Sequence, residues 1–128
     1  MDTPPMPGAL ATIAALVEAY QGRVHLVSKC GPRVAARTRR WLAAWHVFEL
    51  TGLPPGQLHF CRQRADKAPI CARLGVQAFV DDRGDVLRHL RGIVPWRYRF
   101  GGAGRRGLPD AEVIAVADWP AVAAELLP

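Results

Sequence analysis

The sequence lacks paired cysteines and long apolar segments. Its three cysteines, Cys30, Cys61 and Cys71, form no Cys-x-x-Cys pair and no cluster with histidine at zinc-ligand spacing. An odd number of cysteines also argues against a secreted disulfide framework. No apolar run reaches the roughly 20 residues of a membrane-spanning helix, and residues 1–5 lack the basic and apolar regions of a signal peptide. We therefore expect a cytoplasmic protein with no membrane partner.

Lysine is scarce and arginine is abundant. The 128 residues include two lysines and fifteen arginines, and the net charge is +6 with a pI near 10.0. Because guanidinium matches phosphate geometry, this balance suits phosphate-bearing partners, from small phosphoesters to nucleic acid. Half of the residues are hydrophobic and 22% are charged, which is globular composition. No domain boundary is visible, so we predict a single domain over residues 1–128.

Apolar periodicity predicts helices and strands that alternate along the chain. The predicted helices cover residues 9–20, 32–48, 66–74, 85–91 and 119–127, and the predicted strands cover residues 23–27, 57–61, 76–80, 96–100 and 112–117. Strands and helices at this spacing are typical of βα units around a mostly parallel sheet, so the predicted fold class is α/β. Aromatic and arginine residues alternate over residues 96–100, which favours an edge strand.

The second predicted helix carries an apolar stripe beside a basic one. Its apolar residues at helical spacing, which we assign to the core, are Val34, Trp41, Trp45 and Phe48. The basic residues of the neighbouring face are Arg33, Arg37 and Arg40, which form either a solvated face or a binding surface.

Polar and charged residues stand where ligands bind in open α/β sheets. Ser28 and Lys29 end one predicted strand, Lys67 begins a helix, and Asp81 and Asp82 end another strand. The carboxyl ends of parallel strands meet at one edge of the sheet. A hydroxyl and backbone N–H groups can hold a phosphate there, and two carboxylates are good ligands for Mg²⁺. These positions predict a site that binds phosphate together with magnesium.

Each of these residues also has a simpler interpretation. Ser28 could be a turn or helix-cap hydroxyl, and Lys67 a solvated lysine in the first turn of a helix. One carboxyl group of Asp81 and Asp82 could cap the next helix while the other is solvated. Asp85 is expected to be a first-turn helix acid rather than a third metal ligand.

With these residues the chain resembles the haloacid-dehalogenase-like (HAD) phosphatase superfamily over roughly residues 7–100. Leu26-Val27-Ser28 looks like its second motif, whose hydroxyl binds the phosphoryl group, with Lys29 beside it. Lys67 looks like the lysine of the third motif. Phe79-Val80-Asp81-Asp82-Arg83 looks like the fourth motif. The resemblance implies a Rossmann-like three-layer sandwich and Mg²⁺ as cofactor. It also implies Lys67 as a catalytic residue, Ser28 and Lys29 as phosphate-binding residues, and Asp81 and Asp82 as metal ligands.

The first motif of that superfamily, Asp-x-Asp at the end of a strand, is missing. No Asp-x-Asp precedes Ser28, and residues 1–5 look like the segment that follows this motif. Its first aspartate is the nucleophile, so the resemblance implies a phosphoric monoester hydrolase fold that binds a phosphorylated small molecule or nucleotide but is inactive or weakly active. Loss of the central first strand would let its two neighbours pair directly, or leave an open edge that favours homodimerisation.

The alternative hypothesis is a basic, non-catalytic α/β module that binds nucleic acid or an acidic partner. It rests on the net charge, the arginine row of the second predicted helix and the glycine-rich basic loop at residues 101–107. Residues 102–107 match Gly-x-Gly-x-x-Gly, but no helix is predicted to follow, so we interpret them as a mobile turn rather than a dinucleotide site. The four histidines, His25, His46, His59 and His89, show no ligand spacing.

Overall fold

The computed structural model describes residues 3–101 and 113–128. Asp2 and the glycine-rich residues 102–107 lie outside them. The chain divides into a first unit, Met1–Arg62 with Val122–Pro128, and a second unit, Gln63–Ala121. Each is described below by itself, and the single domain expected over residues 1–128 stays a prediction. None of the described helices is long and apolar enough to cross a membrane.

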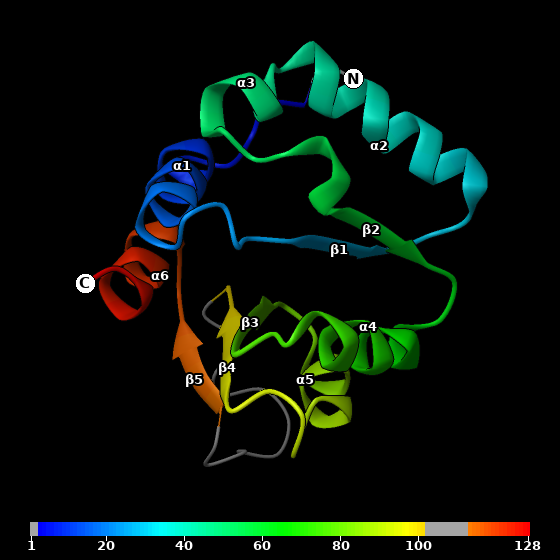
Figure 1. Cartoon of the computed structure of the whole chain (residues 1–128), viewed down its shortest axis with the longest axis vertical. Coiled ribbons are helices and arrows are strands. Elements are labelled where there is room, and N and C mark those ends of the chain that lie inside the picture. Colours follow the sequence, from blue (N-terminus) through cyan, green and yellow to red (C-terminus); the bar gives the residue numbers. More distant parts are fainter. Residues whose placement is uncertain (1–2, 102–112) are drawn as a thin grey trace. The chain divides into compact units, whose positions relative to one another are not determined.

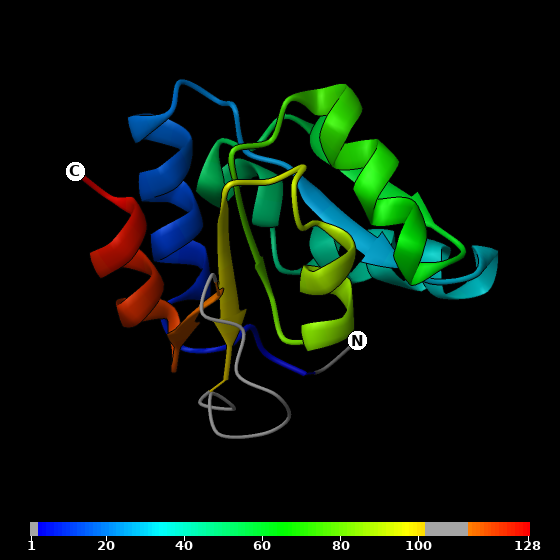
Figure 2. The ribbon, with the colours of Figure 1, turned by 90° about the horizontal axis from the view of Figure 1, so that it is seen from below.

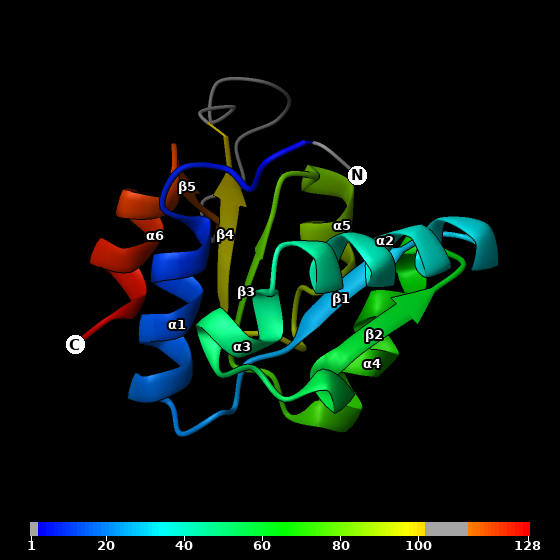
Figure 3. The same cartoon turned by 90° about the horizontal axis from the view of Figure 1, so that it is seen from above.

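The first unit is built on a parallel pair of strands. Helix α1 (Ala9–Ala19) leads to β1 (Leu26–Lys29), then α2 (Pro32–Ala44), α3 (Val47–Thr51), the 3-10 turn η1 (Pro55–Gln57) and β2 (Leu58–Cys61). Leu26 is level with Leu58, and Lys29 with Cys61. Helices α2 and α3 lie on one side of this pair (Figure 1). Residues 122–126 run beside α1 (Figure 3), where the Tyr20 hydroxyl donates to the carbonyl of Leu126.

The single helix expected over residues 32–48 is wrong, because the chain breaks it at His46. His46 has a left-handed backbone with φ 52°, which separates α2 from α3. The buried residues on the two sides of the break are Leu42 of α2 and Val47 of α3. Trp41, Trp45 and Phe48 pack against them as expected. Val34 was expected in the core but is 45% exposed.

A pair of histidines joins the start of β1 to β2. Nδ1 of His25 lies 3.0 Å from Nε2 of His59. The side-chain amide nitrogen of Gln57 donates to the carbonyls of Gly22 and Val24 and lies 3.4 Å from Nε2 of His25. A proton added to that nitrogen would face the amide N–H groups. Burial, and then the charge of His59, lower the pKa of His25.

This lowered pKa makes stability depend on pH. His25 binds a proton more weakly in the folded protein than in the unfolded chain, because its pKa is lowered on folding. The free energy of unfolding should therefore fall as the pH drops from about 6.5, the ordinary histidine pKa, through the lower pKa of folded His25. Above that pH the contribution is fully present. Urea unfolding at pH 7.5 and pH 5.5 measures the difference. We expect His25→Gln to reduce it and the exposed His89→Gln to leave it unchanged; an undiminished difference in His25→Gln would contradict the assignment.

The second unit contains a three-stranded parallel sheet in the order β3-β4-β5. Its elements are the 3-10 turn η2 (Arg64–Asp66), α4 (Lys67–Leu74), β3 (Ala78–Asp81), α5 (Gly84–His89), β4 (Trp96–Phe100), β5 (Val113–Val116) and the start of α6 (Trp119–Leu126). Strand β4 runs beside β3, with α5 packed next to both (Figure 2). The edge position expected for residues 96–100 is therefore wrong, since β4 lies in the middle.

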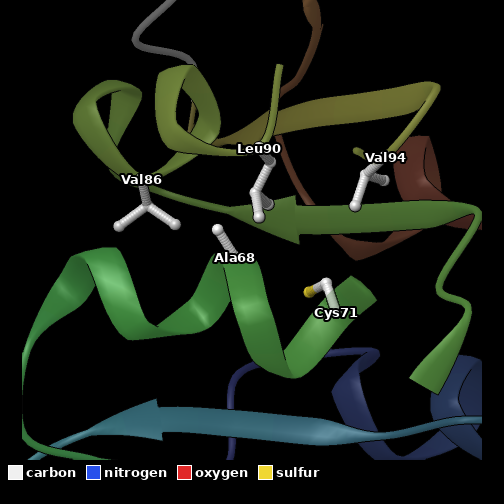
Figure 4. Packing of buried hydrophobic residues seen from close by; sticks show 5 residues of the cluster. All are labelled: Ala68, Cys71, Val86, Leu90 and Val94. Atoms are coloured by element: carbon white, nitrogen blue, oxygen red, sulfur yellow. The ribbon is translucent and has the colours of Figure 1, made fainter. Parts of the chain in front are cut away.

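The core of the second unit forms where α4 and α5 pack against each other and against Phe79 of β3. Ala68 and Cys71 of α4 point toward Val86 and Leu90 of the α5 segment, with Val94 beside them (Figure 4). Cys71 is fully buried, and burial raises the pKa of its thiol to about 11. The thiol is therefore protonated at neutral pH. Val86, Leu87 and Leu90, the apolar residues at helical spacing in the helix predicted over residues 85–91, are all buried.

The α/β class is confirmed, and every strand pair among the described residues is parallel. The strands form two sheets, of two and three strands, and β1 and β3 belong to different ones. Of the two outcomes expected without a central strand, direct pairing of these strands is not observed in the described chain. Each keeps an edge without a strand partner there, and homodimerisation through such an edge stays a prediction.

Candidate functional site

An ion pair inside the second unit joins Lys67 to Asp81. Lys67 Nζ lies 2.9 Å from Asp81 Oδ2, and the two side chains are only 10% and 9% exposed. Lys67 is the first residue of α4, so its side chain starts at the helix end that faces the last residue of β3. The ammonium group also lies 6.0 Å from the centre of the Phe79 ring. Both charges are thus largely shielded from water. Each is compensated by the opposite charge of its partner, and removal of one partner would leave the other buried without compensation.

The end of β3 presents two carboxylates in different environments. Asp81 is the last residue of the strand, and its Oδ1 accepts a hydrogen bond from the backbone N–H of Arg83 at 2.9 Å. This bond closes the turn that leads into α5. Both oxygens of Asp81 are thus engaged. Asp82 is exposed, so its carboxylate is available to a ligand at the same strand end.

Asp85 has a structural role at the start of α5. Its Oδ1 accepts hydrogen bonds from the backbone N–H of Val86 at 2.9 Å and from Nε of Arg83 at 3.2 Å. The hydrogen bond from Arg83 is the main cause that lowers the pKa of Asp85, with Arg64 adding a smaller attraction. Asp85 is therefore a first-turn helix acid, as expected.

Two arginines of β4 lie beside this strand end. Arg99 is the register partner of Asp81, so the two side chains leave the same face of the sheet. Arg97, two residues earlier, is 2% exposed, and its Nη1 donates to the carbonyl of Leu87 at 2.9 Å. This bond ties β4 to α5 and fixes the strand that carries Arg99. The sequence prediction missed both residues.

Ser28 and Lys29 belong to the first unit, whereas Lys67, Asp81 and Asp82 belong to the second. Ser28 lies inside β1 rather than after it, half-buried and level with Phe60, and Lys29 is exposed. The structure thus brings Lys67 and Asp81 into contact and sets Asp82 next to them. The assembly of all five residues into one site stays a prediction.

A small cavity of about 150 Å³ lies at the carboxyl ends of β1 and β2. Cys30, Gly31 and Pro32 form one wall where α2 begins, and Cys61 and Arg62 form another. Neither Ser28 nor Lys29 lines it. The cavity therefore gives the predicted phosphate-binding residues no enclosed site of their own within the first unit.

The residues at the end of β3 can hold Mg²⁺ only in company with another ligand. Among residues 3–101 and 113–128, no three His, Cys, Asp or Glu side chains gather as a metal site. Asp81 is already neutralised by Lys67, which lowers its attraction for a bare cation. Mg²⁺ in phosphate sites commonly takes one or two carboxylates and fills its other positions with water and phosphate oxygens. Both oxygens of Asp81 already have partners, and a role of Asp81 and Asp82 as metal ligands stays a prediction.

The chain was compared with protein families, curated proteins and solved structures, and no family model, curated protein or solved structure matches it.

Proposed function

We propose that this chain is a HAD-like α/β protein that binds a phosphoester together with Mg²⁺ at the carboxyl end of β3, with little or no turnover. The observation that carries the proposal is the buried ion pair of Lys67 and Asp81. The resemblance implies a lysine and a metal-binding carboxylate at these two positions. Their contact at 2.9 Å, with exposed Asp82 beside them, gives that implication a physical basis.

Lys67, Asp81 and Asp82 would contact different parts of the ligand according to their charge. Lys67 would meet the negative charge of the phosphoryl oxygens while it holds Asp81 in place. Asp81 and Asp82 would hold Mg²⁺, which supplies further positive charge to the phosphate when it is bound. Because Lys67 already balances Asp81, phosphate and metal should each improve the binding of the other. Ser28 and Lys29 stay the phosphate-binding residues that the resemblance implies.

Turnover is expected to be low because the sequence contains no Asp-x-Asp before Ser28. The route through an aspartyl-phosphate needs that carboxylate as its nucleophile. We expect no hydrolysis of an aryl phosphate above background. Hydrolysis that disappears in Asp2→Asn would contradict this part of the proposal, since Asp2 would then serve as the nucleophile.

The binding test measures the affinity for inorganic phosphate by calorimetry, with and without Mg²⁺. We expect Mg²⁺ to strengthen phosphate binding about tenfold, equivalent to about 1.4 kcal/mol. Asp82→Asn should abolish this dependence without affecting folding, because Asp82 is exposed. The control is Glu125→Gln, which removes an exposed carboxylate from α6. Phosphate binding that ignores Mg²⁺, or that responds equally in both variants, would refute the proposal.

A second candidate function rests on α2. This helix carries four exposed arginines and no acidic residue; they are Arg33, Arg37, Arg39 and Arg40. Such a row suits a polyanion such as nucleic acid. Affinity for single-stranded DNA that falls steeply with salt, ignores Mg²⁺ and drops in Arg37→Gln would favour this function over the first.

A further inference from the structure

A proline-rich segment of the first unit contacts an aromatic ridge on α2. The ridge consists of Trp41 and Trp45, which lie one helical turn apart with ring centres 6.4 Å from each other. Both side chains are half-buried and pack against the core of this unit. The indole Nε1–H of Trp41 donates to the backbone carbonyl of Thr3 at 2.8 Å. The ridge therefore already holds a piece of proline-rich chain.

The shape of this segment follows from its prolines. Proline fixes its own φ at about −65° and restricts the residue before it to extended or polyproline conformations. Every residue of the segment is constrained in one of these two ways, because the sequence from residue 3 is Thr3-Pro4-Pro5-Met6-Pro7. No helix or strand is formed by residues 3–6. A chain that is already extended loses little conformational entropy when it binds.

A tight turn directs the segment away from α1. The backbone N–H of Ala9 donates to the carbonyl of Met6 at 3.0 Å. Gly8 has φ 84° and ψ −9°, the values of the third residue of a type II turn, and Pro7 occupies the second position. Before this turn the chain stays at the surface: Pro5 is half-buried, and Met6 is 58% exposed. Its contact with the ridge thus uses features that any proline-rich chain shares.

We propose that the ridge of Trp41 and Trp45 is a docking surface for proline-rich peptides of other proteins, and that residues 3–7 occupy it in the free protein. A polyproline chain makes no internal hydrogen bonds, so its carbonyls are free to accept one from an indole N–H. Proline rings also pack well on aromatic side chains. Trp45 extends the surface by one helical turn of about 5.4 Å, which matches about two residues of a polyproline chain. Neither Lys67 nor the phosphate site takes part in this docking.

The test measures the affinity of the full chain for a fluorescently labelled peptide with the sequence of residues 3–8, followed by anisotropy. In the wild-type protein the attached segment competes at a high effective concentration, so the peptide should bind weakly. Pro4→Ala combined with Pro5→Ala increases the conformational freedom of the attached segment. This double variant should bind the peptide about tenfold more tightly than the wild-type protein.

Two further substitutions are made in the double variant. Trp41→Phe keeps an aromatic ring against the core but removes the N–H donor, and should weaken peptide binding about tenfold. The matched control is Trp96→Phe, which removes a tryptophan that is 58% exposed in β4 and should leave the affinity unchanged. Urea unfolding verifies that each variant is folded. A peptide with alanine at its three proline positions should bind to none of these proteins.

Equal affinity of the wild-type protein and the double variant for the peptide would overturn the inference. Equal affinities after Trp41→Phe and Trp96→Phe would also overturn it, as would tight binding of the alanine peptide. Sedimentation tests the remaining occupant, a second copy of this chain. A wild-type dimer that dissociates in the double variant would contradict docking of other proteins, since the ridge would then hold residues 3–7 of the second copy.

Discussion

Lys67→Met is expected to lower the free energy of unfolding by about 3 kcal/mol or more, as for other buried ion pairs that lose one partner. The Asp81 side chain is 9% exposed, so without Lys67 it keeps a carboxylate away from water with no opposite charge at 2.9 Å. Chemical denaturation followed by tryptophan fluorescence measures the loss. The matched control is Lys29→Met, which removes an exposed lysine from β1 and should change stability by less than about 0.5 kcal/mol.

A double variant separates the missing charge from lost packing. Lys67→Met combined with Asp81→Asn removes both charges, and we expect it to be more stable than Lys67→Met alone. The remaining loss then reports the packing of the lysine stem and the hydrogen bond to Arg83. If Lys67→Met is as stable as Lys29→Met, the pair is not buried in solution.

Leu90→Ala is expected to cost about 2–5 kcal/mol, the range for large-to-small changes in a packed core. Leu90 is fully buried among Ala68, Cys71, Val86 and Val94, so truncation leaves a hole between α4 and α5 (Figure 4). Urea unfolding measures the cost.

The control for this change is Ile93→Ala, three residues later. Ile93 is 39% exposed, so we expect its truncation to cost less than about 1 kcal/mol. Similar costs for the two variants would mean that the α4–α5 core is not packed as described.

Most of the helices, and the succession of strands along the chain, could be predicted because the local pattern determines them. In α5 and at the residue that caps its end, Val86, Leu87 and Leu90 repeat at helical spacing, and all three are buried. Gly75 ends α4 with a left-handed backbone at φ 67°, which glycine adopts readily. These signals lie within a few residues of one another, so the sequence alone carries them.

The strand ends and neighbours could not be predicted, since they depend on distant residues. Residues 23–27 read as a strand, but Gln57 occupies the carbonyls of Gly22 and Val24, and pairing begins at Leu26. The alternating arginines of β4 suggested an edge. Arg97 is buried there and its guanidinium donates to the carbonyl of Leu87, a contact that no local pattern reveals.

The residues of the candidate site also differ in whether local sequence or distant residues determine their positions. Lys67 and Asp81 could be placed because a helix start and a strand end meet in βα units. Arg99 could not, because its position next to Asp81 depends on which strand lies beside β3.

Strand β4 has one more consequence, for the order in which the second unit opens. It is bonded to β3 along one side and to β5 along the other. Its peptide groups are thus shielded on both sides, while each neighbouring strand has one side outside this sheet. Amide hydrogens of β4 would exchange with deuterated water only when larger parts of the sheet separate. The amides of the strand that carries Arg97 and Arg99 should therefore exchange more slowly than those of β3 and β5.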